Sequence, residues 1–148
     1  MIVPQEIYHP LYTDTEKFII LITGGRGSGK SFNASTFIER LTFEMTPVEK
    51  IVHQILYTRY TMVSAGMSII PEMMEKIDLD GTTKYFKTTK TDIVNKMTKS
   101  RIMFRGIKTS SGNQTAKLKS IQGITTFVCD EAEEWTSEDE FDKIMLSI

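Results

Sequence analysis

The sequence predicts an α/β fold in which a mainly parallel β-sheet is flanked by helices. Short apolar runs, typical of strands buried on both faces, occur at 18–22, 51–57 and 124–129. Segments with the apolar spacing of helices, at 30–44 and 64–77, lie between these runs. Because parallel strands need long crossover connections, this alternation favours a parallel arrangement.

Length and composition indicate one domain over residues 1–148. The chain has 148 residues, of which 40% are hydrophobic and 25% charged, enough for a buried core with a charged surface. No apolar run approaches the roughly 20 residues of a membrane-spanning helix, so no membrane anchor is expected. The single cysteine, Cys129, excludes an internal disulfide framework and a multi-cysteine zinc site.

The elements of the first half follow from these patterns. We expect an irregular lead-in over 1–16, a strand over 18–22, a helix over 30–44, a strand over 51–57 and a helix over 64–77. Pro47 ends the first helix, and Pro71 should kink or restart the second.

The second half begins with a basic, β-rich segment at 84–107. We expect its strands at 85–88, 92–97 and 101–107, with a turn at 98–100. After the apolar run at 124–129, Ser137 and Glu140 form a capping box that should open a final helix ending near Leu146.

The net charge of −1 conceals a strong asymmetry along the chain. Residues 84–119 hold ten basic residues and one acid, a net charge of +9, whereas residues 120–148 carry −7. Clustered Lys and Arg favour binding to nucleic-acid phosphates. The candidates are Lys96, Lys99, Arg101 and Arg105. The alternatives are a solvated sheet face or a contact surface for the acidic segment of a neighbouring subunit.

Residues 24–31 match the P-loop pattern G-x-x-x-x-G-K-[S/T] in full. Glycines let backbone N–H groups approach phosphate oxygens, and the following helix directs its positive dipole end to the same anion. Lys30 would add a charge beside the β- and γ-phosphates, and the Ser31 hydroxyl is a ligand suited to Mg²⁺. Lys30 also replaces the last glycine of a dinucleotide-binding loop, which disfavours a nicotinamide or flavin cofactor. The expected nucleotide-binding residues are Gly24, Gly25, Arg26, Gly27, Ser28, Gly29, Lys30 and Ser31.

An acidic pair, Asp130 and Glu131, ends the apolar run at 124–129. The carboxyl ends of parallel strands lie at one edge of a sheet, so Asp130 is expected to face Ser31 across a bound Mg²⁺. Glu131 would orient or deprotonate the water that attacks the γ-phosphate of ATP. The alternative is that both acids belong to a solvated loop, since the acidic run continues beyond them.

Together these motifs resemble the ATPase domain of the large terminases of tailed phages, motors that package DNA into procapsids. Besides the P-loop with its Arg26, the resemblance is carried by Leu56-Tyr57-Thr58-Arg59-Tyr60 with Ser64, Phe104-Arg105-Gly106-Ile107, Lys117-Leu118-Lys119-Ser120-Ile121 and Asp130-Glu131-Ala132-Glu133-Glu134. They are similar to the "R-K-T … S", "F-x-G", "K-x-K-S" and "D/E-E-A-E-E" segments of that family. Their order and spacing also agree, over residues 18–148.

The resemblance implies a P-loop NTPase fold of the RecA/ASCE type and a role for each matching residue. Asp130 would be the Walker B acid, Glu131 the catalytic carboxylate, and Arg26 an arginine that stabilises the transferring phosphoryl group. An adenine-contacting segment precedes the P-loop in this family, and Gln5 and Tyr8 are its candidates here. The alternatives are an exposed loop arginine for Arg26 and a core aromatic for Tyr8.

The resemblance also implies partners and limits. Double-stranded DNA, a terminase small subunit, a portal protein and a ring of identical subunits are expected, in the host cytoplasm of a phage-encoded protein. The family continues after its Walker B helix with further strands and a nuclease domain, whereas this sequence ends at Ile148. We therefore expect an ATPase domain that is incomplete at its C-terminus, with weak turnover and no nuclease activity.

Three other functions stay open. A DNA helicase or repair translocase would share the P-loop, but the acidic block argues against it. A small P-loop kinase would not need a second carboxylate, which favours attack by water. A nucleotide-binding or assembly module without turnover is the remaining alternative.

Overall fold

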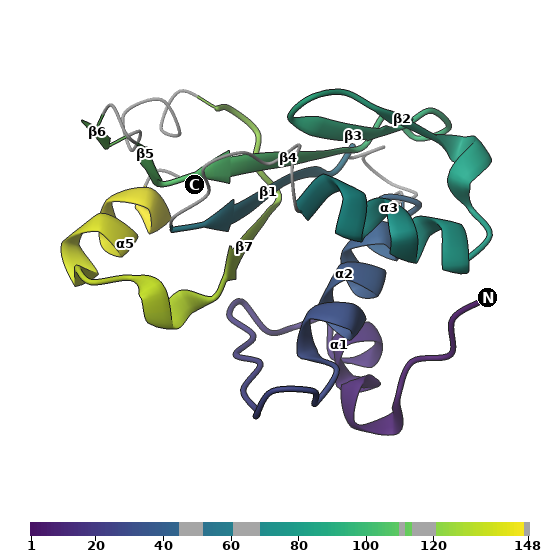
Figure 1. Ribbon diagram of the computed structural model, residues 1–148, viewed down its shortest axis with the longest axis horizontal. Helices are drawn as coiled ribbons and strands as arrows, with labels where there is room; N and C mark the ends of the chain where they lie inside the picture. The colour runs from purple at the N-terminus through teal and green to yellow at the C-terminus, as the bar shows by residue number, and fades with distance from the viewer. Residues whose placement is uncertain (45–51, 61–68, 110–111, 114–120, 147–148) are drawn as a thin grey trace.

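A mixed five-stranded sheet forms the centre of the chain, in the order β2-β3-β4-β1-β7 (Figure 1). The computed structural model describes residues 1–44, 52–60, 69–109, 112–113 and 121–146. The strands are β1 (Gln54–Arg59), β2 (Phe86–Thr88), β3 (Asp92–Asn95), β4 (Arg101–Gly106) and β7 (Thr126–Asp130). β1 pairs in parallel with β4 and β7, whereas β2, β3 and β4 pair antiparallel. The α/β class is confirmed, and the sheet is parallel only around β1.

Helices cover both faces of the sheet. α2 (Lys30–Leu41) and α3 (Ile69–Leu79) lie against one face, where Ile38 and Met73 pack with Ile55 and Tyr57 of β1. α5 (Glu138–Met145) lies against the other face, where Ile144 packs with Leu56. Alternate β1 residues thus point to opposite layers, as the pleat of a strand requires. Among the described helices, none is long and apolar enough to cross a membrane.

The N-terminal segment is more ordered than the expected irregular lead-in. It contains a short 3-10 helix, η1 (Glu6–Tyr8), and one turn of helix, α1 (Pro10–Thr13). The backbone N–H of Ile2 donates to Asp80 Oδ1 at 2.7 Å, and its carbonyl accepts from Arg40 Nη2 at 2.5 Å. The segment is therefore fastened to the ends of α2 and α3.

The predicted helices and strands occur with small shifts of their ends. The helix expected at 30–44 ends at Leu41, and the strand expected at 51–57 lies at Gln54–Arg59. Pro71 lies in the first turn of α3, where its missing N–H has no helical partner to lose. The expected start of this helix, at 64, lies outside the described residues. Ser137 is the extended N-cap of α5, although its side chain makes no capping hydrogen bond.

The basic segment forms the predicted strands β2, β3 and β4. Two-residue strands, β5 (Lys108–Thr109) and β6 (Gly112–Asn113), pair antiparallel after it. The short 3-10 helices η2 (Thr83–Tyr85) and η3 (Ala132–Glu134) complete the described elements.

The strand expected at 18–22 is not formed. The residues there form no regular element and pair with no strand of the described chain, and Phe18, Ile19, Ile20 and Leu21 are 91%, 69%, 48% and 80% exposed. An apolar run sets a preference for burial, but a strand also needs a neighbour that satisfies its backbone groups. None of the described strands supplies that neighbour, so the buried-strand prediction is wrong here.

Candidate functional site

Residues 24–31, the predicted P-loop, form a glycine-rich turn that leads into α2. Gly27 and Gly29 have φ angles of 77° and 79°, in the left-handed region that glycine adopts without strain. Gly29 is the N-cap of α2, and the Asn33 side chain donates to its carbonyl at 2.9 Å. A Cβ added at Gly29 would lie 3.2 Å from Asn33 Nδ2 and 3.2 Å from Gln5 Oε1. The turn therefore depends on glycine at this position.

The Lys30 side chain folds back over the loop. Its ammonium donates to the carbonyl oxygens of Gly24 and Gly25, the second at 3.0 Å. Arg26 and Ser31 are exposed, on the loop and on the first turn of α2 respectively. The loop residues thus keep their polar groups accessible to a ligand, while the lysine charge is held close to them.

Gln5 and Tyr8, the predicted adenine-contacting residues, lie against the P-loop. Tyr8 is only 8% exposed, and its hydroxyl donates to the Ser28 carbonyl at 2.9 Å. Gln5 is beside Gly29, as the distance to a Cβ added there shows. Tyr8 therefore supports the loop from the core side, and its contact with a base stays a prediction.

α2 runs antiparallel to β1, β4 and β7. Its C-terminal end is fixed at the turn before β4, where the Thr98 hydroxyl donates to the Thr42 carbonyl at 2.6 Å and Asn95 Nδ2 donates to the Thr42 hydroxyl at 3.1 Å. Closer to its start, Ser35 is hydrogen-bonded to Tyr57, two residues before the end of β1. The N-terminal end of α2, with the P-loop, consequently points toward the edge where β1 and β7 end (Figure 1).

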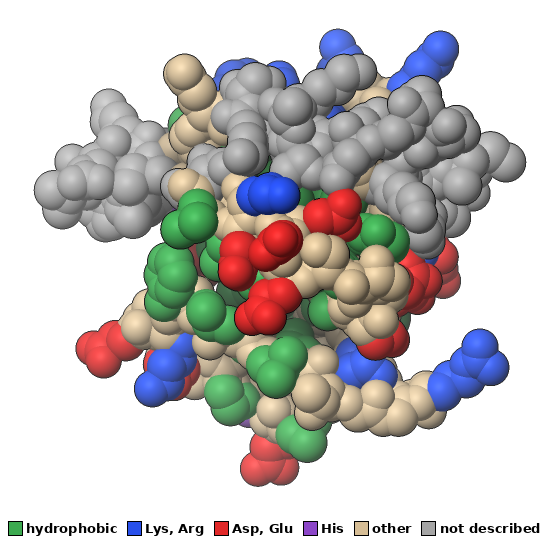
Figure 2. Space-filling view, turned by 90° about the vertical axis from the view of Figure 1, so that its left-hand side faces the viewer, with side chains coloured by type: hydrophobic (Ala, Val, Ile, Leu, Met, Phe, Trp, Pro, Cys, Tyr) green, Lys and Arg blue, Asp and Glu red, His purple; other side chains and the backbone are tan. Residues whose placement is uncertain are grey.

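Asp130 ends β7 at that edge, opposite Arg59 at the end of β1. Arg59 Nη2 and Nε both donate to Asp130 Oδ2, at 2.6 and 3.1 Å, and Nε lies 3.6 Å from Glu131 Oε2. Burial by itself lowers the pKa of Arg59, but the bonds to Asp130 and the charge of Glu131 outweigh it and raise that pKa. Figure 2, which faces this side of the molecule, shows acidic side chains gathered in its middle with a basic side chain above them.

Asp130 and Arg59 point to the face that α2 covers. Val128 packs in the cluster of that face, as Tyr57 does, and residues two positions apart on a strand share a face. Burial raises the pKa of Tyr57, and the charge of Asp130 raises it further, which agrees with this placement. The acidic end of β7 and the helix that carries the P-loop are thus on one face of the sheet.

The Glu131 backbone breaks the alternation of β7. Its φ and ψ are both 51°, a left-handed conformation that is uncommon for a residue other than glycine. Consecutive strand residues point to opposite faces, but this turn brings both carboxylates to the same guanidinium. Burial raises the pKa of Glu131; Arg59 opposes the rise, and Glu134 and Asp130 add to it. Such strain, at a residue with a shifted pKa, is typical of functional sites.

The donor set at this edge fits a metal bound together with a phosphate ligand. No group of three or more His, Cys, Asp or Glu that would hold a metal ion is found among the described residues. Asp130 and Glu131 are adjacent hard oxygen donors, and Mg²⁺ usually binds through one or two carboxylates, substrate phosphates and water. The residues therefore suit Mg²⁺ that arrives with a nucleotide.

The basic residues predicted to bind nucleic acid lie on β4 and on the turn between β3 and β4. In the sheet order these strands are on the opposite side of β1 from β7. Lys96 and Lys99 are exposed in the β3–β4 turn, and Arg101 is exposed at the start of β4. Arg105 is farther along β4 and pairs with Asp92 at 2.9 Å, whereas Arg101 is 3.6 Å from that carboxylate. Three of the four candidates are therefore grouped, and Arg105 is partly neutralised.

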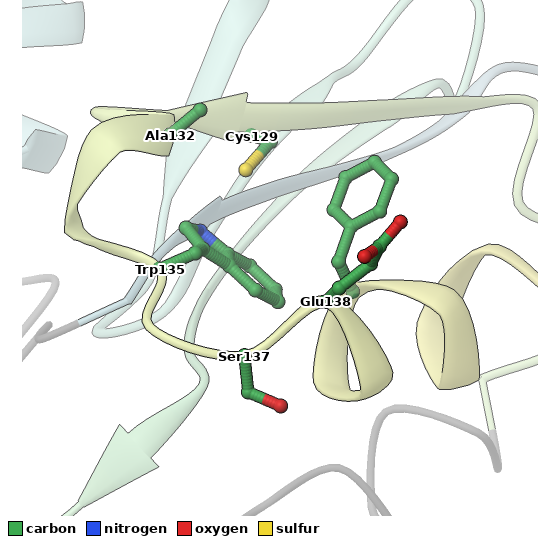
Figure 3. A pocket seen from close by; sticks show the side chains of 6 residues that line it. Cys129, Ala132, Trp135, Ser137 and Glu138 are labelled. Atoms are coloured by element: carbon green, nitrogen blue, oxygen red, sulfur yellow. The ribbon is translucent and has the colours of Figure 1, made fainter.

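A cavity of about 280 Å³ lies on the face opposite Asp130 (Figure 3). The residues that line it are Cys129, Ala132, Trp135, Ser137, Glu138 and Phe141. Burial raises the pKa of the Cys129 thiol to about 11, so the thiol stays protonated near neutrality. With Glu138 as the charged residue of its lining, this cavity does not suit a phosphate. Trp135 packs against Tyr60 and Phe141, as expected for a core residue.

Arg59 is a candidate site residue that no sequence motif singles out, although its segment is one of those that resemble the terminases. Its position as the last residue of a buried-type strand was the available signal, because side chains at carboxyl ends of parallel strands often build sites. Arg59 pairs with Asp130 because β1 and β7 are neighbours in the sheet. The order of strands in a sheet cannot be deduced from the spacing of motifs along the sequence.

A family model described as "Phage terminase large subunit" matches residues 16–148. The matched range contains the P-loop, Arg59 and the acidic pair, and it begins after Gln5 and Tyr8. No curated protein matches this sequence.

Proposed function

The chain belongs to the phage terminase large subunit family, and from that premise we propose that it is the ATP-hydrolysing motor domain of a DNA-packaging terminase. One observation carries the proposal beyond the family. α2 begins, and β7 ends, toward the same edge and face of the sheet, which supports a site built there from the glycine-rich loop and the two carboxylates. Such a site is what hydrolysis of a nucleoside triphosphate requires.

ATP would bind through the P-loop and the start of α2. The backbone N–H groups between Gly24 and Ser31 would cradle the phosphates, helped by the helix dipole. Lys30 would exchange the carbonyls of Gly24 and Gly25 for phosphate oxygens, because a charged acceptor binds an ammonium more strongly than a neutral one. Gln5, beside Gly29, would contact the base.

Hydrolysis would depend on Glu131. A bound Mg²⁺, held by Ser31 and Asp130, would neutralise phosphate charge. Glu131 would accept a proton from the attacking water, and the burial that raises its pKa makes its carboxylate a stronger base. Arg26, exposed on the loop, would stabilise the phosphoryl group in transfer.

The grouped basic residues would contact double-stranded DNA. Lys96, Lys99 and Arg101 are exposed together, and such clusters gain binding energy from release of counterions. A terminase small subunit, a portal protein and a ring of identical subunits in the host cytoplasm are the partners and setting that we propose from the family.

Two variants of the full chain test the proposal. Lys30→Ala should abolish Mg²⁺-dependent ATP binding in calorimetry, while Lys17→Ala, at an exposed residue of the N-terminal segment, should leave it unchanged. Glu131→Gln should still bind ATP but release phosphate at least about 100-fold more slowly, the usual contribution of a general base. Unchanged ATP affinity in Lys30→Ala would remove the P-loop assignment.

The same assay separates the remaining functions. A wild-type chain that binds ATP but releases no phosphate would be a nucleotide-binding module. The close pairing of Arg59 with both carboxylates favours this as the second candidate for the isolated chain. A phosphorylated small acceptor would instead identify a kinase.

A further inference from the structure

The N-terminal segment lies beside α2 and contacts both ends of that helix (Figure 1). Near the C-terminal end of α2, the Ile2 carbonyl accepts a hydrogen bond from Arg40 Nη2 at 2.5 Å. Near the N-terminal end, the Tyr8 hydroxyl donates to a carbonyl of the glycine-rich loop at 2.9 Å, and Gln5 lies beside Gly29. The segment therefore reaches from the last turn of α2 to the loop that precedes the helix.

The segment then returns along the same side of α2. The Tyr12 ring packs edge-on against Phe37, with ring centroids 5.3 Å apart, and its centroid lies 5.9 Å from the guanidinium carbon of Arg40. Residues three apart on a helix share a side, so Phe37 and Arg40 are neighbours there. One guanidinium thus contacts both ends of the range 2–12, through Ile2 and through Tyr12.

Asp80, the residue after α3, fixes this guanidinium in place. Arg40 Nε and Nη2 donate to the two carboxylate oxygens of Asp80 at 2.9 and 2.8 Å, and the Ile2 N–H donates to Oδ1 at 2.7 Å. The side chains of Arg40 and Asp80 are 28% and 5% exposed, and hydrogen bonds between ionised groups are among the strongest in proteins. Ile2 is therefore held through both its N–H and its carbonyl.

We propose that Arg40 is a positioning residue for nucleotide binding, which fastens both ends of the range 2–12 so that Gln5 is presented beside the phosphate loop. The inference rests on the proposed function and names a residue that sets its preference for a nucleoside triphosphate over a bare triphosphate. Arg40 acts through the segment, because it lies about three turns along α2 from Gly29, or about 16 Å along the helix axis.

The two parts of ATP would then depend on different parts of the chain. The triphosphate would bind to the loop backbone and to Lys30, which the segment does not supply. The base would meet Gln5, whose position depends on the segment. A segment that is ordered before binding loses little freedom when the nucleotide arrives, whereas a released segment would be ordered at that moment and weaken the affinity. Loss of Arg40 should therefore affect ATP more than inorganic tripolyphosphate.

Two variants of the full chain test this inference, with ATP and tripolyphosphate each titrated in the presence of Mg²⁺ by calorimetry. Arg40→Met keeps an unbranched side chain but removes its charge and its donors. The ratio of ATP to tripolyphosphate affinity should fall about ten-fold, the effect of losing one charge-assisted contact, while tripolyphosphate affinity is unchanged. Deletion of Ile2 and Val3 keeps the pair of Arg40 with Asp80 and removes only the fastened end of the segment, so it should lower the ratio in the same way.

Lys84→Gln is the matched control. The Lys84 ammonium lies 4.9 Å from the centroid of the Tyr85 ring, so this change removes one positive charge and one cation–aromatic contact from η2 instead of from the N-terminal segment. Both affinities should stay at their wild-type values.

Two results with the variants would overturn the proposal. An equal loss of both affinities in Arg40→Met would show that the residue only supports the fold, and an unchanged ratio in either folded variant would show that the fastening does not matter. If Arg40→Met does not fold, the deletion variant decides by the same ratio. A wild-type chain that binds ATP no more tightly than tripolyphosphate overturns this inference and leaves the proposed function standing. One that binds neither defeats the proposed function, and the inference with it.

Discussion

Glu39 is a carboxyl group buried between α2 and the end of α3. It is 0% exposed, accepts a hydrogen bond from the Thr82 hydroxyl through Oε1, and its Oε2 has no hydrogen-bond donor among the described residues. Asp80 lies nearby, paired with Arg40 at 2.8 Å. Burial raises the pKa of Glu39 to about 7, against the lowering effect of Thr82. Glu39 thus holds a proton in the folded chain at pH values where an exposed glutamate has lost it.

This shift predicts that stability falls as pH rises. The unfolded chain releases the Glu39 proton near the ordinary glutamate pKa of 4.5 and the folded chain near 7, so the folded state binds more protons in between. The free energy of unfolding should decrease through this window by up to about 3 kcal/mol and then level off. Denaturant unfolding between about pH 5 and pH 8 measures it, and Glu39→Gln should flatten the curve. Asp80, whose pKa is lowered, loses its contribution only at more acidic pH, so it cannot produce this slope. A wild-type stability that rises with pH would contradict the assignment.

At the scale of residues, the sequence could predict chemistry where one local motif contains it. The predictions of the P-loop residues and of the pair Asp130 and Glu131 rest on such motifs. Arg59 and Glu39 were not, because their significance comes from partners about 70 and 40 residues away, brought near by strand order and helix packing. Burial of a glutamate in a polar-looking helix segment leaves no local signal.

The start of α2 shows how one element positions the site. Gly29 has a left-handed φ of 79°, and a Cβ added there would lie close to Asn33 and Gln5. A Cβ added at Gly25 would meet nothing within 4 Å, and the φ of Gly25 is not in the left-handed region. The two glycines therefore differ in what they contribute, although both belong to the same motif. Gly29 sets the direction in which the chain enters the helix.

We predict that Gly29→Ala destabilises the fold and weakens ATP binding, and that Gly25→Ala does neither. An alanine at a left-handed position costs about 1–2 kcal/mol, and contact with Asn33 adds to that cost. Unfolding in denaturant gives the first effect, and titration with ATP and Mg²⁺ the second. Equal stability of the two variants would show that the loop relaxes freely and does not constrain α2.

At the scale of elements, prediction succeeded where a segment carries its own pattern. α2, β1, β4, β7 and α5 all occur within a few residues of the predicted positions. The run Phe18 to Leu21 has an equally strong apolar pattern and forms no strand. The two segments differ in their tertiary surroundings. β1 is hydrogen-bonded to β4 and β7, whereas the apolar run has no neighbour among the described strands. Apolar composition alone cannot supply a hydrogen-bonded partner.

The whole molecule separates its charges in space as well as in sequence. Basic side chains of the β3–β4 turn lie at the amino end of β4, and the acids of β7 and η3 lie at the carboxyl edge of the sheet. The two ends of a nearly neutral chain thus carry opposite charges, which fits the proposed binding of DNA at one end and of a metal–nucleotide at the other. This separation predicts which lysines and arginines respond to salt.

Lys96, Lys99 and Arg101 should dominate DNA binding, and Arg105 should matter less because Asp92 already compensates its charge at 2.9 Å. Each of Lys96→Ala, Lys99→Ala and Arg101→Ala should weaken binding of a duplex of mixed sequence and reduce the slope of log K against log salt by about 0.9, the value for one phosphate contact. Arg105→Ala and the control Lys17→Ala should change that slope little. Fluorescence anisotropy across a series of salt concentrations measures it. A slope that none of the three variants alters would mean that this group is a solvated sheet face, because counterion release cannot occur at residues that do not touch phosphates.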